Sequence, residues 1–241
     1  MEDIYKLFDD YVSNFDMNND KIQNKYNHTY RVVKYAEKIA ISEKLNEEDK
    51  KLAMICALLH DIGRFKQVTE YDTFHDNLSF DHGDMGYIIL KENNYIDKYT
   101  DNDEDKNIVL KAVKNHNKLI IEDGLTDREL YFAKLTRDAD KLDIFFTQHN
   151  EIKDNSDTIN EKFLDSIKNR KQALNEYASN ECEWLLRLIC FIYDLNFKES
   201  FNIILENDTL NKKIDLLNRV KNIDINYIRQ EINNYVKERI D

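Results

Sequence analysis

The feature that most limits how this chain can fold is its lack of turn-forming residues. Its 241 residues include no proline and only four glycines. Strands joined by tight turns depend on both residue types, so a β-rich fold is excluded. We therefore expect an all-α protein. Its length is enough for one large domain, or for one domain with an extension.

One apolar segment places two polar side chains where water should be scarce. The segment from Ala53 to Leu59 is uniformly apolar and is followed directly by His60 and Asp61. A helix that is apolar on all sides should be buried, and Gly63 is expected to end it. Burial of an imidazole beside a carboxylate requires partners, which a metal ion or a mutual hydrogen bond could supply. The segment alone leaves both interpretations open.

Three more histidines lie on or at the ends of apolar helix faces. His28 shares a face with Val32 and Ile39, His82 opens a helix, and His116 ends one. A single histidine on such a face is usually an ordinary core residue. Several of them, each needing separate hydrogen bonds, are better explained by one metal-bearing cavity. Periodicity leaves one choice open, because either Asp138 or Asp140 could face the core.

Charge and cysteine content restrict the classes of binding partner and the cellular location that we expect. The formal net charge of −12 argues against a nucleic-acid strand or an anionic membrane as the principal partner, but it permits a small phosphate ester in a locally positive pocket. Cys56, Cys182 and Cys190 lie in apolar surroundings without metal-type spacing, which indicates reduced core thiols. The acidic N-terminus does not resemble a targeting segment, and no apolar run is long enough to span a bilayer. We therefore expect a soluble, cytoplasmic protein.

Five ordered sequence blocks resemble one bacterial branch of the HD-domain metal-dependent phosphohydrolase superfamily. His28, the His60-Asp61 doublet and a late aspartate follow the order of its metal signature. The blocks, which together cover roughly residues 22–148, are HTYRV, LLHDIGRF, YDTFHDNLSFDHGDMG, NHNK and RDADKLD. The glycine-tyrosine-proline motif of the cyclic-dinucleotide phosphodiesterase branch is absent, which argues against a cyclic dinucleotide as the substrate.

The resemblance implies a set of metal ligands. His28, His60, Asp61 and Asp140 would bind one ion, with Asp140 chosen because Lys141 and Leu142 follow it as in the family pattern. His82 and His116 fall where binuclear members bind a second ion, with Asp61 bridging the two. This donor set suits Mn, Fe, Co, Ni or Zn, at one or two ions per chain.

Several cations and one amide are candidates for contact with a small phosphorylated substrate. Arg64 is the first choice and Lys118 the second, and with Asp61 they form the expected catalytic set. Lys66 and Asn117 are further substrate-binding candidates. A surface charge or a helix-end charge is the alternative interpretation for each cation, and for Lys66 it is the favoured one. The segment 65–81 lacks a clear period, so it is a candidate lid, part of which could be helical.

The expected organisation is an HD-type metal-binding helical domain at residues 1–150 and a helical C-terminal extension, 151–241, packed on that core. The extension would support the core, shape the substrate pocket or form a homodimer contact. The expected function is hydrolysis of a nucleotide or other small phosphate ester by a metal-activated hydroxide. The alternatives are an HD-fold di-iron oxygenase and a non-catalytic metal-binding regulatory module.

Overall fold

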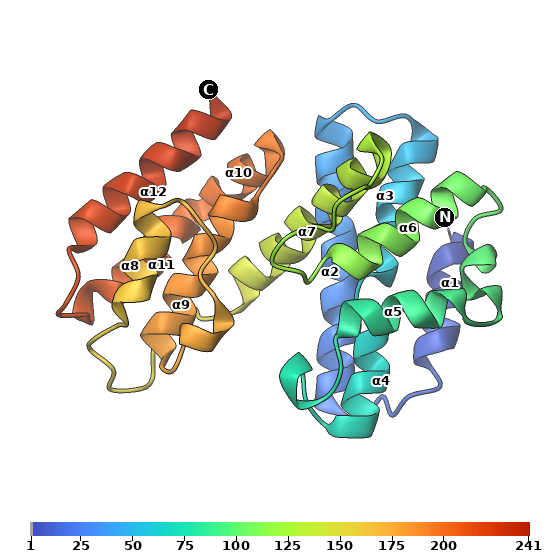
Figure 1. Cartoon of the computed structure of the whole chain (residues 1–241), viewed down its shortest axis with the longest axis horizontal. Coiled ribbons are helices and arrows are strands. Elements are labelled where there is room, and N and C mark those ends of the chain that lie inside the picture. The colour runs from blue at the N-terminus through green and yellow to red at the C-terminus, as the bar shows by residue number, and fades with distance from the viewer. Residues whose placement is uncertain (1) are drawn as a thin grey trace. The chain divides into compact units, whose positions relative to one another are not determined.

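The computed structural model describes residues 2–241, without the side chains of Glu2 and Asn93, and contains no β-strand within that range (Figure 1). The all-α prediction is confirmed. No helix in the described range is long and apolar enough to cross a lipid bilayer. The first seven α-helices are α1 (Glu2–Val12), α2 (Asp20–Ser42), α3 (Glu47–Leu59), α4 (Ile62–Tyr71), α5 (His82–Lys91), α6 (Asp103–Asn115) and α7 (Asp127–Thr147). Those that follow are α8 (Glu161–Lys168), α9 (Glu181–Ile189), α10 (Lys198–Leu205), α11 (Thr209–Leu216) and α12 (Ile225–Ile240).

Short 3₁₀ helices extend or connect these elements. They are η1 (Asp76–Leu78), η2 (Glu92–Lys98), η3 (Asn175–Tyr177), η4 (Cys190–Asp194), η5 (Glu206–Asp208) and η6 (Leu217–Arg219). The chain divides within α7 into two compact units, one running to Asp140 and the other from Lys141 to Asp241. This division lies before the boundary at residue 150 that the sequence suggested.

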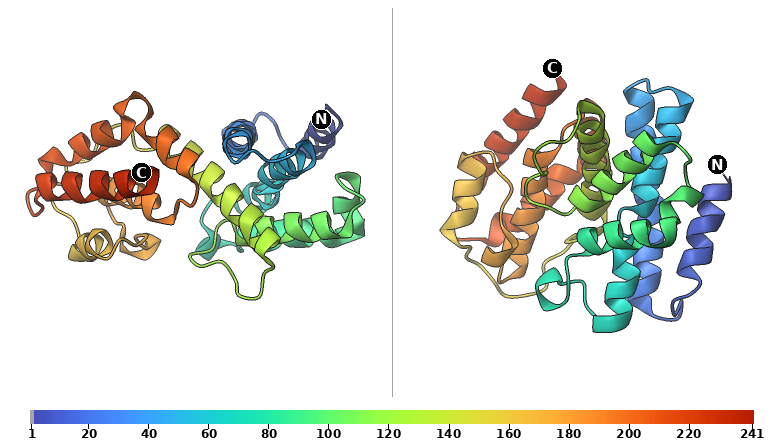
Figure 2. Two further views of the ribbon diagram at one scale, coloured as in Figure 1. Left: turned by 90° about the horizontal axis from the view of Figure 1, so that it is seen from above. Right: turned by 45° about the vertical axis from the view of Figure 1, so that its right-hand side comes forward.

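In the first unit, α3 is the central helix. It packs against α2 and α6, and α5 packs against α4 and α6 (Figures 1 and 2). Every residue of α3 from Leu52 to Leu59 is buried, as its uniformly apolar sequence predicts. Asn46 caps the start of this helix by accepting a hydrogen bond from the backbone N–H of Asp49 at 2.8 Å. The buried helix therefore delivers His60 and Asp61, at its C-terminal end, to the interior of the unit.

Gly63 does not end the buried helix, which corrects the expectation from sequence. The helix α3 stops at Leu59, and Gly63 lies in the first turn of α4. A Cβ atom at Gly63 would lie 2.3 Å from the carbonyl oxygen of His82 and 2.9 Å from the backbone nitrogen of Gly86. Glycine is therefore needed here for the close contact of α4 with α5, which brings His82 towards the His60-Asp61 doublet.

The segment 65–81 is partly helical, because α4 continues to Tyr71. Asp72 then ends the helix in the left-handed conformation at φ 49°. The remaining residues, 73–81, form a connection that contains only the short helix η1. Only this latter part is available as a lid.

In the second unit, α9 and η4 supply a large part of the core. Leu185, Leu186, Ile189 and Ile192 are buried, in agreement with the broad apolar face expected around Trp184. The helix α11 packs against α9, and α12 packs against α8 and α10. The ammonium of Lys213 donates hydrogen bonds to oxygens of residues 148–150 at 2.6 to 3.2 Å, and so holds the C-terminal end of α7.

A chain with so few glycines must place other residues in the left-handed region at its turns. Lys44, which follows the C-cap of α2, has φ 57° and is exposed. A side chain in this conformation costs about 1–2 kcal/mol relative to right-handed backbone, whereas glycine adopts it freely.

Replacing Lys44 with glycine should therefore raise the free energy of unfolding by about 0.5–1 kcal/mol. Glycine removes the backbone strain from the folded state, and this gain exceeds the loss that comes from the greater conformational entropy of the unfolded chain. Urea denaturation measures the effect. The matched control is Lys51→Gly, at an exposed position inside α3, which should lower the free energy of unfolding by about 1 kcal/mol. If Lys44→Gly and Lys51→Gly both lower the free energy of unfolding, the assignment of backbone strain to Lys44 is wrong.

Candidate metal centre

The side chains of His60 and His116 are fixed in the same way, each just beyond the end of a buried helix. His60 Nδ1 lies 2.7 Å from the carbonyl oxygen of Ala57, and His116 Nδ1 lies 2.7 Å from that of Val113. A carbonyl only accepts, so Nδ1 donates and Nε2 is left to face the interior. Both imidazoles are almost fully buried, at 0% and 2% exposure. The two helix ends thus present two oriented ligand atoms.

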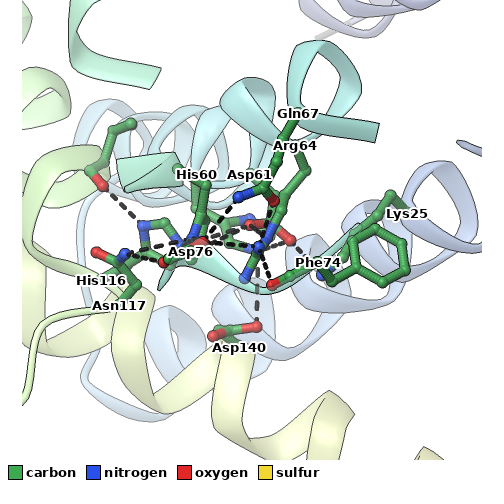
Figure 3. Close-up of polar contacts among 12 residues, drawn as sticks. Lys25, His60, Asp61, Arg64, Gln67, Phe74, Asp76, His116, Asn117 and Asp140 are labelled. Atoms are coloured by element: carbon green, nitrogen blue, oxygen red, sulfur yellow. Dashed lines mark hydrogen bonds and ion pairs between the residues drawn. The ribbon is translucent and has the colours of Figure 1, made fainter. Parts of the chain in front are cut away.

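The first group of ligand atoms combines α2, the α3–α4 junction and α7. His28 Nε2 lies 3.1 Å from Asp140 Oδ1, 3.3 Å from His60 Nε2 and 3.5 Å from Asp61 Oδ2. His60 Nε2 lies 3.4 Å from the same oxygen of Asp61. Periodicity left open which of Asp138 and Asp140 faces the core; Asp138 is fully buried, and Asp140 is the aspartate that the structure places against His28 and His60 (Figure 3).

A second group of ligand atoms gathers around the other oxygen of Asp61. The Nε2 atoms of His82 and His116 each lie 3.4 Å from Asp61 Oδ1, and they lie 3.0 Å from each other. The carboxylate therefore presents Oδ2 to one pair of histidines and Oδ1 to another. This is the arrangement that a bridging ligand requires.

The donor chemistry of the second group fits a metal ion. The Nδ1 atoms of His82 and His116 both point at acceptors, so in the neutral imidazoles both Nε2 atoms carry lone pairs. Two lone pairs facing each other at 3.0 Å repel unless a cation satisfies them. Burial lowers the pKa of His82 to about 3 and also lowers that of His116, which keeps both rings neutral, as ligands must be.

The two carboxylates are held in the ionised form. Burial alone would raise the pKa of Asp61, but the charges of Lys25 and His60 outweigh burial and hold that pKa well below its usual range. The pKa of Asp140 is lowered in the same way, because its contacts with His28 and His60 outweigh the effect of burial. A buried site with two carboxylate anions and several imidazoles is suited to a first-row divalent cation.

Asp76, in η1, is a positioning residue that sequence reasoning missed. Its carboxylate accepts from His82 Nδ1 at 2.7 Å (Oδ2) and 2.9 Å (Oδ1). Oδ1 also accepts from Gln67 at 2.9 Å and Arg64 at 3.0 Å, and Oδ2 accepts from Asn117 at 3.2 Å. Figure 3 shows the side chains of Arg64, Gln67 and Asn117 around Asp76. A carboxylate on the far nitrogen of a ligating histidine fixes its tautomer and orientation.

Arg64, the first choice for a phosphate contact, is used differently in this structure. Its Nη1 donates to the side chain of Gln67 at 2.5 Å, to the carbonyl oxygen of Phe74 at 2.7 Å and to Asp76. Its Nε is buried, lies 3.6 Å from Asp61 Oδ1 and has no hydrogen-bond partner among residues 2–241. Arg64 therefore fastens the connection 73–81 to α4. Direct contact with a phosphate stays a prediction.

The other candidates from sequence lie around the second group of ligands or outside it. Lys118 pairs with Asp81 at 2.6 Å and Asp84 at 3.1 Å, at the start of α5. Asn117 donates to Asp81 at 3.0 Å as well as to Asp76. Lys66 pairs loosely with Glu70 along α4, at 3.9 Å. None of these contacts is with Asp61, and the roles of Lys118, Asn117 and Lys66 as substrate contacts stay predictions.

The cation that lies nearest to Asp61 is Lys25, which was not among the candidates from the sequence. Its Nζ lies 2.6 Å from Asp61 Oδ2 and 5.4 Å from the centre of the Phe74 ring (Figure 3). A signal was present in the sequence, because Lys25 precedes His28 by three residues and so shares its face of α2. A second missed residue is the buried Arg137, whose Nη1 donates to the carbonyl oxygen of Asn115 at 2.8 Å and thereby supports the end of α6.

If Asp76 positions His82, removing its carboxylate should weaken metal binding. We expect Asp76→Ala to lower affinity for added Mn or Co by about 10- to 100-fold, and Asp76→Asn, which can still accept from Nδ1, to lower it less. Competition with a chromophoric chelator measures the affinity. Asp72→Asn is the matched control, because Asp72 pairs with Lys21 at 2.6 Å instead of with a histidine. Wild-type affinity in Asp76→Ala would contradict the assignment.

Comparison with known proteins identifies the family. Residues 26–145 match the family model described as HD domain, and this span contains all six candidate ligands. Searches of curated proteins and of solved structures gave no match. The family is all-α, and its members bind divalent metals and include many hydrolases. The two groups of ligands around Asp61 lie in the part of the chain that matches it, and the chain belongs to the HD-domain family.

Proposed function

We propose that this protein is a metal-dependent phosphohydrolase that acts on a nucleotide or another small phosphate ester. The observation that carries the proposal is the buried carboxylate of Asp61, whose two oxygens face separate pairs of histidine Nε2 atoms at 3.4 to 3.5 Å. Membership of the HD-domain family supports metal-dependent hydrolysis as the class of reaction. The substrate and the reaction on phosphate are our inference.

Two ions would be held by the side chains already described. His28, His60, Asp61 and Asp140 would hold one, and His82 and His116 would hold the other, with Asp61 shared. Such ions supply Lewis acidity to a phosphoryl group and lower the pKa of water. The imidazole-rich donor set suits Mn, Fe, Co, Ni or Zn better than Mg.

The residues of the chain itself would orient the substrate and complement its charge. Lys25 is the cation at the centre, and its ammonium donates to Asp61 Oδ2 in the structure. Because a metal ion would take over that oxygen, the ammonium of Lys25 would be free to donate to a phosphoryl oxygen beside it. Phosphoryl transfer depends mainly on positioning and on neutralising charge, which is the role proposed for Lys25.

The connection 73–81 would form one wall of the substrate site. Phe74 lies near two cations, with Lys25 Nζ 5.4 Å and Arg64 Cζ 5.8 Å from its ring centre. An aromatic side chain beside a phosphate-binding cation offers a surface for a nucleobase or another planar group. The net charge of −12 supports a small phosphorylated ligand over a nucleic-acid strand.

Metal stoichiometry should separate the two ion sites. We expect purified protein to hold one to two first-row ions per chain by elemental analysis. His82→Ala and His116→Ala should each keep about one ion and lose most activity, whereas Asp61→Ala should lose most of both. Full metal content and full turnover in His82→Ala would indicate a mononuclear centre.

Oxygen consumption without release of inorganic phosphate, on a panel of esters assayed aerobically and anaerobically, would overturn the phosphohydrolase proposal in favour of oxygenase chemistry.

Substitution of Lys25 should affect turnover without removing metal. Lys25→Met should lower kcat/KM for a hydrolysed phosphate ester by about 10- to 100-fold, the equivalent of about 1.4–2.8 kcal/mol of transition-state stabilisation, and Lys25→Arg should recover part of it. Lys21→Met is the control, since Lys21 also lies on α2 and pairs with Asp72. Steady-state rates and metal analysis are measured together. Unchanged kcat/KM in Lys25→Met would leave the Lys25–Asp61 ion pair with a structural role only.

A further inference from the structure

The second unit contains a cation that has no anionic partner. Arg187, on α9, is partly exposed, its side chain forms no ion pair within residues 2–241, and its Nε is buried without a hydrogen-bond partner there. Burial lowers the pKa of Arg187 to about 10. Taking a guanidinium out of water without a counter-charge is unfavourable, so an unpaired arginine in this position needs an explanation.

Two aromatic rings hold the guanidinium in place. Arg187 Cζ lies 5.0 Å from the ring centre of Phe191 and 5.6 Å from that of Trp184. Trp184 and Phe191 are three residues before and four residues after Arg187, so all three side chains share one face of α9 and η4. Stacking of this kind occupies the faces of the guanidinium, while its edge carries the N–H groups that bind oxyanions.

The surroundings of Arg187 add positive charge. Burial lowers the pKa of His149, the charges of Lys213 and Arg187 lower it further, and the charge of Glu181 raises it, which places these four groups near one another. Lys213 is itself buried and gives its hydrogen bonds to neutral oxygens of residues 148–150. This part of the second unit therefore has two cations beside the one carboxylate of Glu181, even though the whole chain carries a net charge of −12.

The carboxylates around α9 are occupied elsewhere. Glu183 accepts from the backbone N–H groups of Asn160 and Ser179, each at 2.7 Å. Asp194 pairs with Lys141 at 2.8 Å. Glu181, at the first turn of α9, accepts from backbone N–H groups of residues 153 and 154. If one of these carboxylates were to pair with Arg187, an existing contact would be broken. A bound ligand is therefore the simpler source of the missing counter-charge.

We propose that Arg187, Trp184 and Phe191 form a binding site for a small phosphate-type oxyanion. The guanidinium fork matches two oxygens of a phosphate group, and the partly exposed side chain of Arg187 can offer its Nη atoms to a small anion. The anion is either free phosphate or the phosphoryl group of a nucleotide, whose base could stack on the partly exposed Trp184. This site uses residues of the second unit only and does not depend on the phosphohydrolase proposal.

Trp184 is the only tryptophan of the chain and therefore reports on this site directly. Its fluorescence would be followed while inorganic phosphate, AMP or, at equal ionic strength, chloride is added to the full-length protein. We expect a saturable change with phosphate and none with chloride. Tighter binding of AMP than of phosphate would identify a nucleotide site, and equal binding would identify a site for the phosphate group alone. A wild-type protein without a saturable response to either phosphate compound would overturn the proposal.

Variants assign the response to Arg187. Arg187→Met should abolish the fluorescence response and, by removing an unpaired and partly buried charge, raise the melting temperature without phosphate. Arg187→Lys keeps the charge but not the fork, so it should bind about tenfold more weakly. The matched control is Arg170→Met, because Arg170 also stacks on an aromatic ring, that of Tyr235 at 5.5 Å, but is paired with Glu238 at 2.6 Å. This variant should respond like the wild type.

Two results would overturn the assignment even if phosphate binds. The first is an unchanged response in both Arg187→Met and Arg187→Lys. The second is a response that Lys25→Met abolishes and Arg187→Met does not, which would place the bound phosphate at the metal centre. Binding of polyglutamate that Arg187→Met abolishes, in a protein that shows no saturable response to phosphate or AMP, would assign this face of α9 to an acidic macromolecule and would also overturn the proposal.

Discussion

The buried carboxylate of Asp61 is the constraint on which the rest of the first unit depends. An anion with 2% exposure is tolerated only when both of its oxygens are satisfied. In this chain Oδ2 faces Lys25, His28 and His60, while Oδ1 faces His82 and His116. Five elements must therefore meet at one point, since Lys25 and His28 come from α2, the doublet from the α3–α4 junction, and the other histidines from α5 and the end of α6. The packing of these helices and the chemistry of the centre are consequences of the same charge.

Hydrogen bonds at helix ends orient two of the histidine ligands. His60 and His116 each lie just past a helix and donate to a carbonyl oxygen of its last turn, and Arg137 supports the end of α6 through further carbonyl oxygens. His82, at the start of α5, cannot use that device, because the backbone groups free at a helix start are N–H donors. A carboxylate, Asp76, is used instead. The connection 73–81 is thus required by the metal centre, and Arg64 and Gln67 are used to hold it.

The two units differ in how they treat buried charge. In the first unit each buried ligand carboxylate is matched by cations or imidazoles. In the second unit the stacked guanidinium of Arg187 has no such match among residues 2–241. A site whose charge is completed only by a ligand is a common way for a protein to recognise an anion, and the proposal of an oxyanion site rests on this difference.

Much of this protein can be predicted from its sequence, for a physical reason in each case. The lack of proline and the scarcity of glycine predict an all-α fold, because turn chemistry is a local property. The apolar run of α3 predicts burial of the His60-Asp61 doublet, because an apolar helix cannot be exposed on every side. The family blocks give the order of the metal ligands, and the resemblance points to Asp140 over Asp138.

Tertiary structure alone decides the rest, because it depends on which faces meet. Periodicity left Asp138 and Asp140 equivalent, and only the crossing of α7 with α2 brings Asp140 to His28 at 3.1 Å. The local sequence predicts that a helix ends at Gly63, but in the structure Gly63 lies within α4, where α5 approaches closely. Arg64 and Lys25 are both cations beside ligands in the sequence. The fold directs Arg64 to Asp76 and Lys25 to Asp61, because long side chains pair with whichever carboxylate the packing places within their reach.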